Sequence, residues 1–469
     1  MAAPTRYLSS RDRSSYVPVH AVWEITLACD LKCHHCGSRA GPRRADELTT
    51  EECLDLVRQL ARMGTREVTL IGGEAYLRRD WLQIVREVRD QGMDCTMQSG
   101  GLNLTEDRIK AAVDAGLQGL GISIDGLREV HDRVRGVKGS FDAAFKALRA
   151  IQQCGIDSSV NTQITSLVIP QLRELMNLFI DAGATNWQVQ LTVAMGRAAD
   201  NPELLLQPYE LLELMPLLAE LFEEGADRGL LLQPGNNIGY FGSYESVWRG
   251  SGDDRIHWTS CNAGQNTLGI EADGTIKGCP SLATTSYAGG NVRDLSLKDI
   301  WWNSEELSIN RDRGSAGLWG FCGSCYYAGV CKAGCTWTTH SLFGKAGNNP
   351  YCHHRALELS KQGLRERIVQ VEKAPGTSFD HGRFELILET LDGKRLPPTS
   401  DNLVQIKRSS APVELILCRG CNRHVKTGTE RCPFCSGDIH TLAKQHDKKL
   451  REAKRAYRRL LKLLPQVSP

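Results

Sequence analysis

The chain has 469 residues, of which 41% are hydrophobic and 24% charged, and its formal net charge is +2. These values describe a globular protein of two or three domains, and so small a net charge gives no general attraction to nucleic acid. Residues 1–19 are polar and lack the apolar core of a secretory signal, and no apolar run approaches the length of a membrane span. We therefore expect a cytoplasmic protein with a polar N-terminal tail at 1–19 and no membrane partner.

Strands and helices alternate from residue 20 to about 230. Hydrophobic periodicity, with Gly, Asp or Asn at the joints, predicts six strand–helix units. The predicted strands are 20–29, 67–71, 94–98, 117–124, 158–165 and 187–193, and the predicted helices are 50–63, 80–90, 106–115, 141–153, 171–182 and 208–224. Because a complete barrel has eight such units, we predict an α/β fold whose core is a partial (β/α)6 TIM barrel at 20–235. Its site should lie at the carboxyl ends of the strands.

The rest of the chain divides where its composition changes. We expect a Gly-rich and aromatic junction, then a small Cys-rich domain with short strands that ends in a helix at 356–371, then a linker with short strands. A compact Cys module and a basic amphipathic helix with a tail follow. The corresponding ranges are 236–258, 259–371, 372–412, 413–440 and 441–469.

Cysteine is the most informative residue type in this chain. There are 17 Cys, and fourteen of them fall in three groups within residues 29–36, 261–352 and 418–435. A secreted disulfide scaffold would be short, whereas grouped Cys in a long chain without a signal indicate metal ligation in a reducing compartment. The other three, Cys53, Cys95 and Cys154, are isolated, and we expect them to be ordinary buried thiols.

The first group, Cys29, Cys33 and Cys36, is a C-x3-C-x2-C array directly after the first predicted strand. Three thiolates can hold three corners of a cubic iron–sulfur cluster and leave the fourth iron open. The array alone would also fit a structural zinc ion with a His as fourth ligand. Its position at the carboxyl end of a barrel strand favours the cluster.

Polar residues and glycines follow the next three strands at the same edge. They are Gly72, Gly73 and Glu74 after the second strand, residues 98–101 after the third and residues 123–126 after the fourth. Glycine lets a ligand approach the backbone, and a carboxylate such as Glu74 can accept a hydrogen bond from an ammonium group. The segments together suit a ligand with ribose, ammonium and carboxylate groups.

These motifs resemble the radical S-adenosylmethionine (SAM) superfamily over about residues 20–230. The resemblance implies a [4Fe–4S] cluster on the first Cys group, with its open iron on the amino and carboxylate groups of SAM. It places His35 near the adenine and matches Gly72, Gly73 and Glu74 to the motif that holds the ammonium group of SAM. Ser99, Ser123 and Asp125 fall where the ribose and methionine contacts lie, and Arg135 resembles an Arg that meets the carboxylate. A solvated loop position would explain Arg135 equally well. Ala75 departs from the family, because many members have Pro after the GGE motif.

The second group holds seven Cys, which is awkward for tetrahedral zinc but suits two clusters if one lacks a Cys ligand. Its spacing resembles the SPASM domain over about 260–355. The resemblance implies an outer cluster on Cys322, Cys325, Cys331 and Cys352 and an inner one on Cys261, Cys279 and Cys335. Residues 262–278 contain no Cys, so the inner cluster should be open at one iron or closed by a non-Cys ligand. Pro280 replaces the Asp of sulfatase-maturing relatives, which argues against formylglycine formation. The clusters could equally be structural or carry electrons.

The third group, a CxxC pair in a compact module, suits a zinc ribbon, with a rubredoxin-type iron as the alternative. Its Cys are Cys418, Cys421, Cys432 and Cys435. The following helix carries nine Lys or Arg against two acidic residues in 441–463. Three interpretations stay open: a solvated helix docked on the enzyme, a surface for an acidic peptide or partner, and nucleic-acid binding.

The leading interpretation is a radical SAM/SPASM maturase that generates a 5′-deoxyadenosyl radical and oxidatively modifies a ribosomally made precursor peptide. The modification would be a crosslink or a related C–H functionalisation, since auxiliary clusters can accept the second electron. Expected cofactors are three [4Fe–4S] clusters, SAM and zinc. Expected partners are the peptide, an electron donor such as flavodoxin or ferredoxin, and either the C-terminal module or a separate protein for leader binding.

Two other functions remain. One is a radical SAM enzyme that acts on a protein side chain or a small cofactor precursor. The other is a non-catalytic iron–sulfur and zinc protein that binds nucleic acid, which would require the GGE motif and residues 123–126 to be coincidental.

Overall fold

The computed structural model describes residues 6, 8–250, 255–397 and 414–463. Parts of five predicted segments lie outside the described residues: 1–5 and 7 of the tail, 251–254 of the junction, 398–412 of the linker, 413 of the Cys module and 464–469 at the C-terminus. The predicted domain boundaries stay predictions. No helix in the described ranges is long and apolar enough to cross a membrane.

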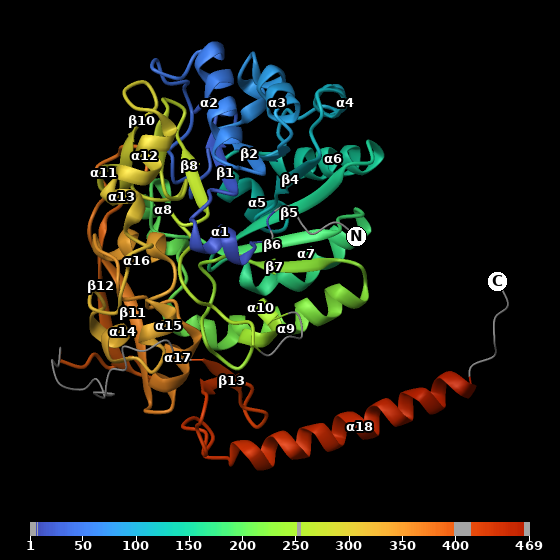
Figure 1. Cartoon of the computed structure of the whole chain (residues 1–469), viewed down its shortest axis with the longest axis vertical. Coiled ribbons are helices and arrows are strands. Elements are labelled where there is room, and N and C mark those ends of the chain that lie inside the picture. Colours follow the sequence, from blue (N-terminus) through green and yellow to red (C-terminus); the bar gives the residue numbers. More distant parts are fainter. Residues whose placement is uncertain (1–5, 7, 251–254, 398–413, 464–469) are drawn as a thin grey trace.

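The core of the molecule is one ten-stranded sheet in the order β10-β9-β8-β1-β2-β3-β4-β5-β6-β7. Seven strands from the N-terminal half pair in parallel (Figure 1). They are β1 (His20–Glu24), β2 (Glu67–Ile71), β3 (Asp94–Ser99), β4 (Gly119–Ser123), β5 (Asp157–Ile164), β6 (Asn186–Leu191) and β7 (Leu231–Pro234). Their carboxyl ends therefore meet at one edge, and the predicted partial barrel is confirmed.

Six long helices follow the first six strands, as predicted. They are α2 (Thr50–Arg62), α3 (Trp81–Asp90), α4 (Glu106–Asp114), α6 (Ser140–Gln153), α7 (Leu172–Asp181) and α9 (Leu211–Asp227). Helix α2 shows why they form: Thr49 and Glu52 make a reciprocal capping box, and Leu56 and Leu60 are buried on one face.

Two elements of the barrel were not predicted from the sequence. Strand β7 pairs with β6 and is a seventh parallel strand where six were expected. Helix α5 (Arg128–Arg135) follows β4 and buries His131, Val134 and Arg135. Both escape hydrophobic patterning, because β7 is short and ends in Pro234, and because two of the three buried residues of α5 are polar.

The Cys-rich region extends the same sheet on the other side of β1. Strand β8 (Thr267–Ile270) pairs in parallel with β1, and β9 (Thr275–Lys277) and β10 (Ala288–Asn291) continue the sheet in antiparallel register. The helices of this region are α11 (Thr284–Tyr287), α12 (Leu297–Asn303), α13 (Glu305–Ser308), α14 (Gly320–Ser324), α15 (Ala328–Cys331), α16 (Thr336–Phe343) and α17 (His353–Ser360). Short helices elsewhere are α1 (Ser10–Ser14), α8 (Arg197–Asp200) and α10 (Glu245–Gly250).

The helix predicted for 356–371 is wrong in its second half. Helix α17 ends at Ser360, and Gly363 takes a positive φ of 72° before the chain enters β11 (Leu364–Glu372). Strand β11 pairs with β12 (Arg383–Thr390) in a two-stranded sheet. Ile368, Val369 and Val371 in β11 are β-branched, and such residues favour a strand. The predicted linker is therefore partly a hairpin, and its connecting residues 373–382 return to the barrel.

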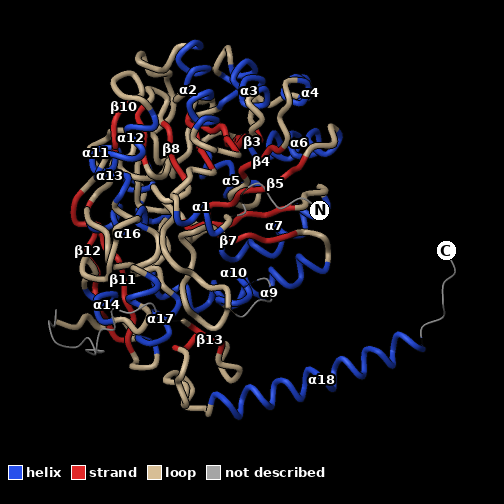
Figure 2. The backbone as a smooth tube through the Cα atoms, viewed as in Figure 1, coloured by secondary structure: helices blue, strands red, loops and turns tan. Residues whose placement is uncertain are grey.

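The C-terminal module is a small hairpin, β13 (Leu415–Leu417) and β14 (His424–Lys426), followed by helix α18 (Ile439–Leu463). Figures 1 and 2 show α18 extending away from the rest of the molecule. The side chains of residues 447–456 are exposed. The interpretation of a helix docked on the enzyme is therefore wrong, and its basic face is open to a partner.

Candidate active site and metal centres

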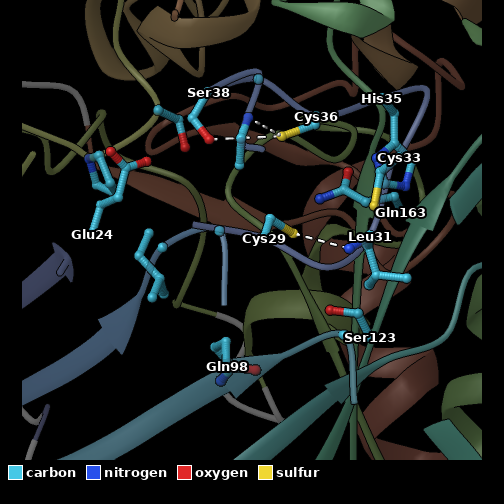
Figure 3. Close-up of a pocket in the computed structure, with 18 of the residues that line it drawn as sticks. Glu24, Cys29, Leu31, Cys33, His35, Cys36, Ser38, Gln98, Ser123 and Gln163 are labelled. Atoms are coloured by element: carbon cyan, nitrogen blue, oxygen red, sulfur yellow. Dashed lines mark hydrogen bonds between the residues drawn. The ribbon is translucent and has the colours of Figure 1, made fainter. Parts of the chain in front are cut away.

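A cavity of about 350 Å³ opens at the carboxyl ends of the parallel strands, where the barrel meets the Cys-rich region. Cys29, Cys33 and Cys36 line it from the loop after β1. Figure 3 shows their sulfur atoms around one space. All but one of the residues that the resemblance assigned to SAM also line this cavity: His35, Gly72, Gly73, Glu74, Ser99, Ser123 and Arg135.

The Cys loop is held in place by its backbone on two sides. On one side, Lys32 N donates to Arg135 O (3.1 Å) and His34 N donates to Val134 O (2.8 Å) at the end of α5. This contact requires Gly136, because a Cβ there would lie 2.4 Å from the Lys32 carbonyl oxygen. On the other side, the Arg197 guanidinium donates to the Cys33 carbonyl at 2.7 Å. The three thiols are thus presented by a fixed loop.

The two glycines of the GGE motif serve the protein's own backbone. A Cβ on Gly72 would lie 2.4 Å from Thr26 O, and one on Gly73 would lie 2.2 Å from Ala28 O. Gly73 N also donates to Thr26 O at 2.8 Å. The loop after β2 therefore packs against the chain just before Cys29, which brings Glu74 beside the Cys array.

Glu74 is buried and already holds two hydrogen bonds. Its carboxylate accepts from the Ser99 hydroxyl and from Gly100 N, both at 2.6 Å. Burial raises the pKa of Glu74 to about 7, although these two bonds oppose the shift. Ser99 and Glu74 therefore act as one polar unit at this wall of the cavity.

Asp125 lies behind the cavity wall and organises two residues that do line it. Its carboxylate accepts from His35 Nε2 at 2.7 Å and from Arg135 at 2.6 Å. Burial alone would raise the pKa of Asp125, but the charges of Arg135 and His35 hold it well below its usual range. Arg135 is itself buried, 3.7 Å from the Cys33 sulfur, so it is not a solvated loop residue.

The seven Cys of the second group separate into the two predicted sets. Cys322, Cys325, Cys331 and Cys352 line one small cavity. Cys335 lies close enough to Cys261 and Cys279 for their charges to affect its pKa, which burial chiefly raises to about 12. The isolated Cys are elsewhere, with Cys53 in α2, Cys95 in β3 and Cys154 at the end of α6. These three Cys belong to elements of the barrel and not to the Cys-rich region.

The third group is drawn together much more tightly than the other two. Cys418 Sγ lies 3.8 Å from Cys435 Sγ, and Cys421 Sγ lies 3.7 Å from Cys432 Sγ. Zinc–sulfur bonds of about 2.3 Å in a tetrahedron give sulfur–sulfur distances of about 3.8 Å. These four sulfur atoms all lie within 4.8 Å of one another, which no other set of three or more Cys achieves within the described ranges; the one further set that is as compact joins Cys29 to Asp30 and Glu74. The module therefore fits a single ion, and the wider sets fit larger clusters.

A row of side-chain amides lines the barrel side of the cavity, and the sequence analysis singled out only its first member, Gln98. Gln98, Asn161, Gln163, Gln188 and Gln190 come from β3, β5 and β6. A possible signal was the placement of polar residues at every second position of strands that are otherwise apolar. Across from them, the Cys-rich region and the loop after β11 contribute Glu271, Trp337 and Phe379.

Comparison with known proteins identifies two domains. Residues 23–178 match the Radical SAM superfamily, and residues 261–326 match SPASM, an iron–sulfur cluster-binding domain. The chain therefore carries a Radical SAM domain followed by a SPASM domain, an arrangement that implies binding of SAM and iron–sulfur clusters.

Its relatives differ in substrate. The chain is 27% identical over 344 residues to the AdoMet-dependent heme synthase of Methanosarcina barkeri, covering 71% of this chain and 95% of the synthase. It is 28% identical over 333 residues to mycofactocin maturase MftC of Mycolicibacterium smegmatis, covering 70% and 81%. The structure of Streptococcus suis SuiB bound to precursor peptide SuiA has the same fold, with a TM-score of 0.57 at 17% identity over 72% of this chain and 75% of SuiB.

Proposed function

We propose that this enzyme oxidatively modifies a ribosomally made precursor peptide. The observation that carries the proposal is the row of five Gln and Asn side chains along the cavity. A primary amide both donates and accepts hydrogen bonds, which matches the N–H and C=O groups of a peptide backbone. A mycofactocin maturase is among the relatives, and SuiB, which has the same fold, has been solved bound to a precursor peptide.

A small cofactor precursor such as a porphyrin is the second candidate, because the heme synthase matches over most of its length. Porphyrins carry several carboxylates, which proteins bind with Arg or Lys. Among the described residues that line the cavity, the only Arg or Lys side chains are Arg135, paired with Asp125, and Arg197, which donates to two backbone carbonyls. The other ionisable side chains there include the acids Glu24, Glu74 and Glu271, which offer no positive charge to such a substrate.

The catalytic cluster would be held by Cys29, Cys33 and Cys36, and with SAM it would supply the 5′-deoxyadenosyl radical that takes a hydrogen atom from the substrate. The protein's own residues bind and orient. Glu74, fixed by Ser99, would accept hydrogen bonds from the SAM ammonium group. Asp125 would keep His35 and Arg135 directed at the cavity.

Three clusters and one zinc ion complete the proposal. The outer cluster would be held by the four Cys of the second group that share a cavity, and the inner cluster by Cys261, Cys279 and Cys335 with a non-Cys fourth ligand. These clusters would pass one electron of the oxidation to a flavodoxin or ferredoxin, the type of donor that would also reduce the catalytic cluster. The thiols suit the reducing cytoplasm. The exposed basic helix α18, or a separate protein, would bind the peptide leader.

The test is anaerobic reaction of the reconstituted, reduced enzyme with SAM and a short peptide encoded beside its gene. We expect 5′-deoxyadenosine and a peptide lighter by two hydrogen atoms per turnover. Iron coproporphyrin III, offered in place of the peptide, should be recovered unchanged. Conversion of the porphyrin with no change in the peptide would establish the second candidate instead.

A further inference from the structure

Glu24, the last residue of β1, is a buried acid with no role in the proposed cofactor site. Glu24 lines the cavity and is only 3% exposed. Ser38 hydrogen-bonds the carboxyl group, but Oε1 has no partner among the described residues. Figure 3 shows Glu24 and Ser38 on the side of the cavity away from His35 and Cys33. Buried polar atoms are nearly always paired, so Oε1 indicates a missing ligand.

The charged neighbours of Glu24 are bound to one another and leave this oxygen free. Glu271 accepts from Arg44 at 3.1 Å, from Lys277 at 2.9 Å and from the Thr284 hydroxyl. Lys277 also donates to Leu282 O at 2.7 Å. Burial and the nearby Glu271 charge raise the pKa of Glu24 to about 8. A carboxyl group that keeps its proton at neutral pH can bind an uncharged amide without a counter-ion.

The loop between β11 and β12 brings an aromatic ring to the same space. Phe379 lines the cavity with a φ of 56°, a left-handed conformation that is costly for a residue with a side chain. Its N–H donates to Gly37 O at 3.0 Å, next to Cys36. Its ring lies 3.6 Å from the Lys277 ammonium. Strained residues of this kind persist where the surrounding structure holds them for a function.

The loop that carries Phe379 is fixed by Asp380. This carboxylate accepts from Arg39 at 2.9 Å and from Thr377 N at 2.9 Å. Arg39 follows the Cys array, so a segment more than three hundred residues later is tied to the loop that presents the catalytic thiols. Trp337 from α16 adds a second ring to the cavity wall, with its indole N–H 3.2 Å from Met195 Sδ.

We propose that Glu24, Phe379 and Trp337 form the subsite for the residue of the peptide that is modified. The two rings pack against an apolar or aromatic side chain, and Glu24 Oε1 accepts the backbone N–H of that residue. The inference rests on the proposed peptide substrate and adds which residue type the enzyme selects. It assigns a specificity role to a loop outside the conserved domain matches, which end at residue 326.

The test uses capped tripeptides, acetyl-Gly-Xaa-Gly-amide, with the full-length reconstituted enzyme and SAM under anaerobic conditions. Saturation-transfer NMR reports their binding without any turnover. Peptides with Leu or Phe at the central position should bind more strongly than those with Asp or Lys. Methylation of the central amide nitrogen should weaken binding about fivefold, the value of one hydrogen bond.

Variants of the enzyme test whether the tripeptide binds at this subsite. Glu24→Leu and Phe379→Ala should each weaken binding of the Leu peptide about fivefold or more, whereas Glu24→Gln, which keeps a carbonyl acceptor, should retain most of it. Glu223→Leu on the exposed surface of α9 and Trp302→Ala on the exposed face of α12 are the matched controls. Equal binding of charged and apolar peptides, or no loss in Glu24→Leu and Phe379→Ala, would overturn the subsite. Failure of the proposed function is separate, because it would show as an unmodified precursor peptide.

Discussion

The Cys array of the barrel and the Cys module at the C-terminus use the same residue in opposite arrangements. In the module, opposite pairs of sulfur atoms lie 3.7 and 3.8 Å apart, and Cys435 is exposed to solvent. In the barrel, the sulfur atoms of Cys29, Cys33 and Cys36 are spread around a cavity and are not all within 4.8 Å of one another. The first arrangement closes on one ion, and the second leaves room for a cluster and a ligand. The comparison shows that the same residue type forms a compact set that fits a single ion and an open set that fits a larger cluster.

The largest expected effect is on the barrel array. Changing Cys29, Cys33 and Cys36 together to Ala should abolish 5′-deoxyadenosine formation and remove about one four-iron cluster per chain, because no other Cys of the described part of the chain lines that cavity. Chromatography of the nucleoside and analysis of iron, sulfide and zinc would measure this. Zinc should stay unchanged, and Cys53→Ala in α2 is the control. Undiminished 5′-deoxyadenosine would contradict the assignment.

The converse change should affect only the module. Replacing Cys418 and Cys421 by Ser should remove one zinc ion per chain and leave the iron content intact, since the module's four sulfur atoms converge on a single point. Metal analysis of the two proteins gives the answer. A wild-type protein that holds no zinc and shows a rubredoxin-like absorption spectrum would refute the zinc assignment.

The buried ion pair beside the barrel array, Asp125 with Arg135, should contribute several kcal/mol to the free energy of unfolding. Asp125→Asn leaves the buried Arg135 without its counter-charge, which we expect to lower the free energy of unfolding by about 3 kcal/mol. Asp142→Asn removes an exposed partner of Arg128 and should lower the free energy of unfolding far less, because solvent screens this pair. Urea unfolding of the metal-free proteins compares them. Similar losses for both variants would contradict this account.

The same pair makes a pH prediction. The folded pKa of Asp125 is lowered, so its contribution to stability is present above the ordinary Asp pKa of about 3.9 and is lost as pH falls toward the folded value. The stability difference between wild type and Asp125→Asn should therefore be constant near neutral pH and shrink in acid. A stability difference that grows as the pH falls would contradict the lowered pKa of Asp125.

The C-terminal module also packs against the cavity that is lined by the four Cys of the proposed outer cluster. Weakening this contact should have a smaller effect. Phe434, between Cys432 and Cys435, stacks on Tyr327 at 5.9 Å and contacts His354 at 5.6 Å, and both of these rings line the cavity of Cys325. Phe434→Ala should speed alkylation of Cys325 in the metal-free protein roughly fivefold, as expected for about 1 kcal/mol of lost local stability. Peptide mapping by mass spectrometry measures it, and an unchanged rate would show that the module does not shield this site.

The smallest effect concerns helix α18. Changing Lys448, Lys449 and Arg451 to Gln should slow association of an acidic leader peptide by up to about tenfold at low salt and very little at high salt. Stopped-flow fluorescence at two salt concentrations tests this, with Lys110→Gln on α4 as the control. If association is unaffected at both concentrations, a separate leader-binding protein becomes the better explanation.

The sequence predicted most of the barrel because its strands and helices follow simple periodicities, as in α2 with buried Leu56 and Leu60. The spacing of the Cys groups pointed to the candidate cluster ligands, and their assignment stays a prediction. What it could not predict depends on contacts between distant segments. Burial of Arg135 and the position of Asp125 behind the wall follow from how α5 meets the Cys loop. Phe379 reaches the cavity only because the predicted helix at 364–371 is a strand that turns the chain back.

The parallel pairing of β1 with β8 has a consequence for how the protein is made. His20 is paired with Thr267, so one edge of β1 stays unpaired until residues of β8 have left the ribosome. An open strand edge invites aggregation, and so late a partner makes folding slow. The cavity is completed later still, because Phe379, which lines it, is synthesised more than three hundred residues after the Cys residues that line the same cavity. Until then the Cys loop lacks the wall that Phe379 provides.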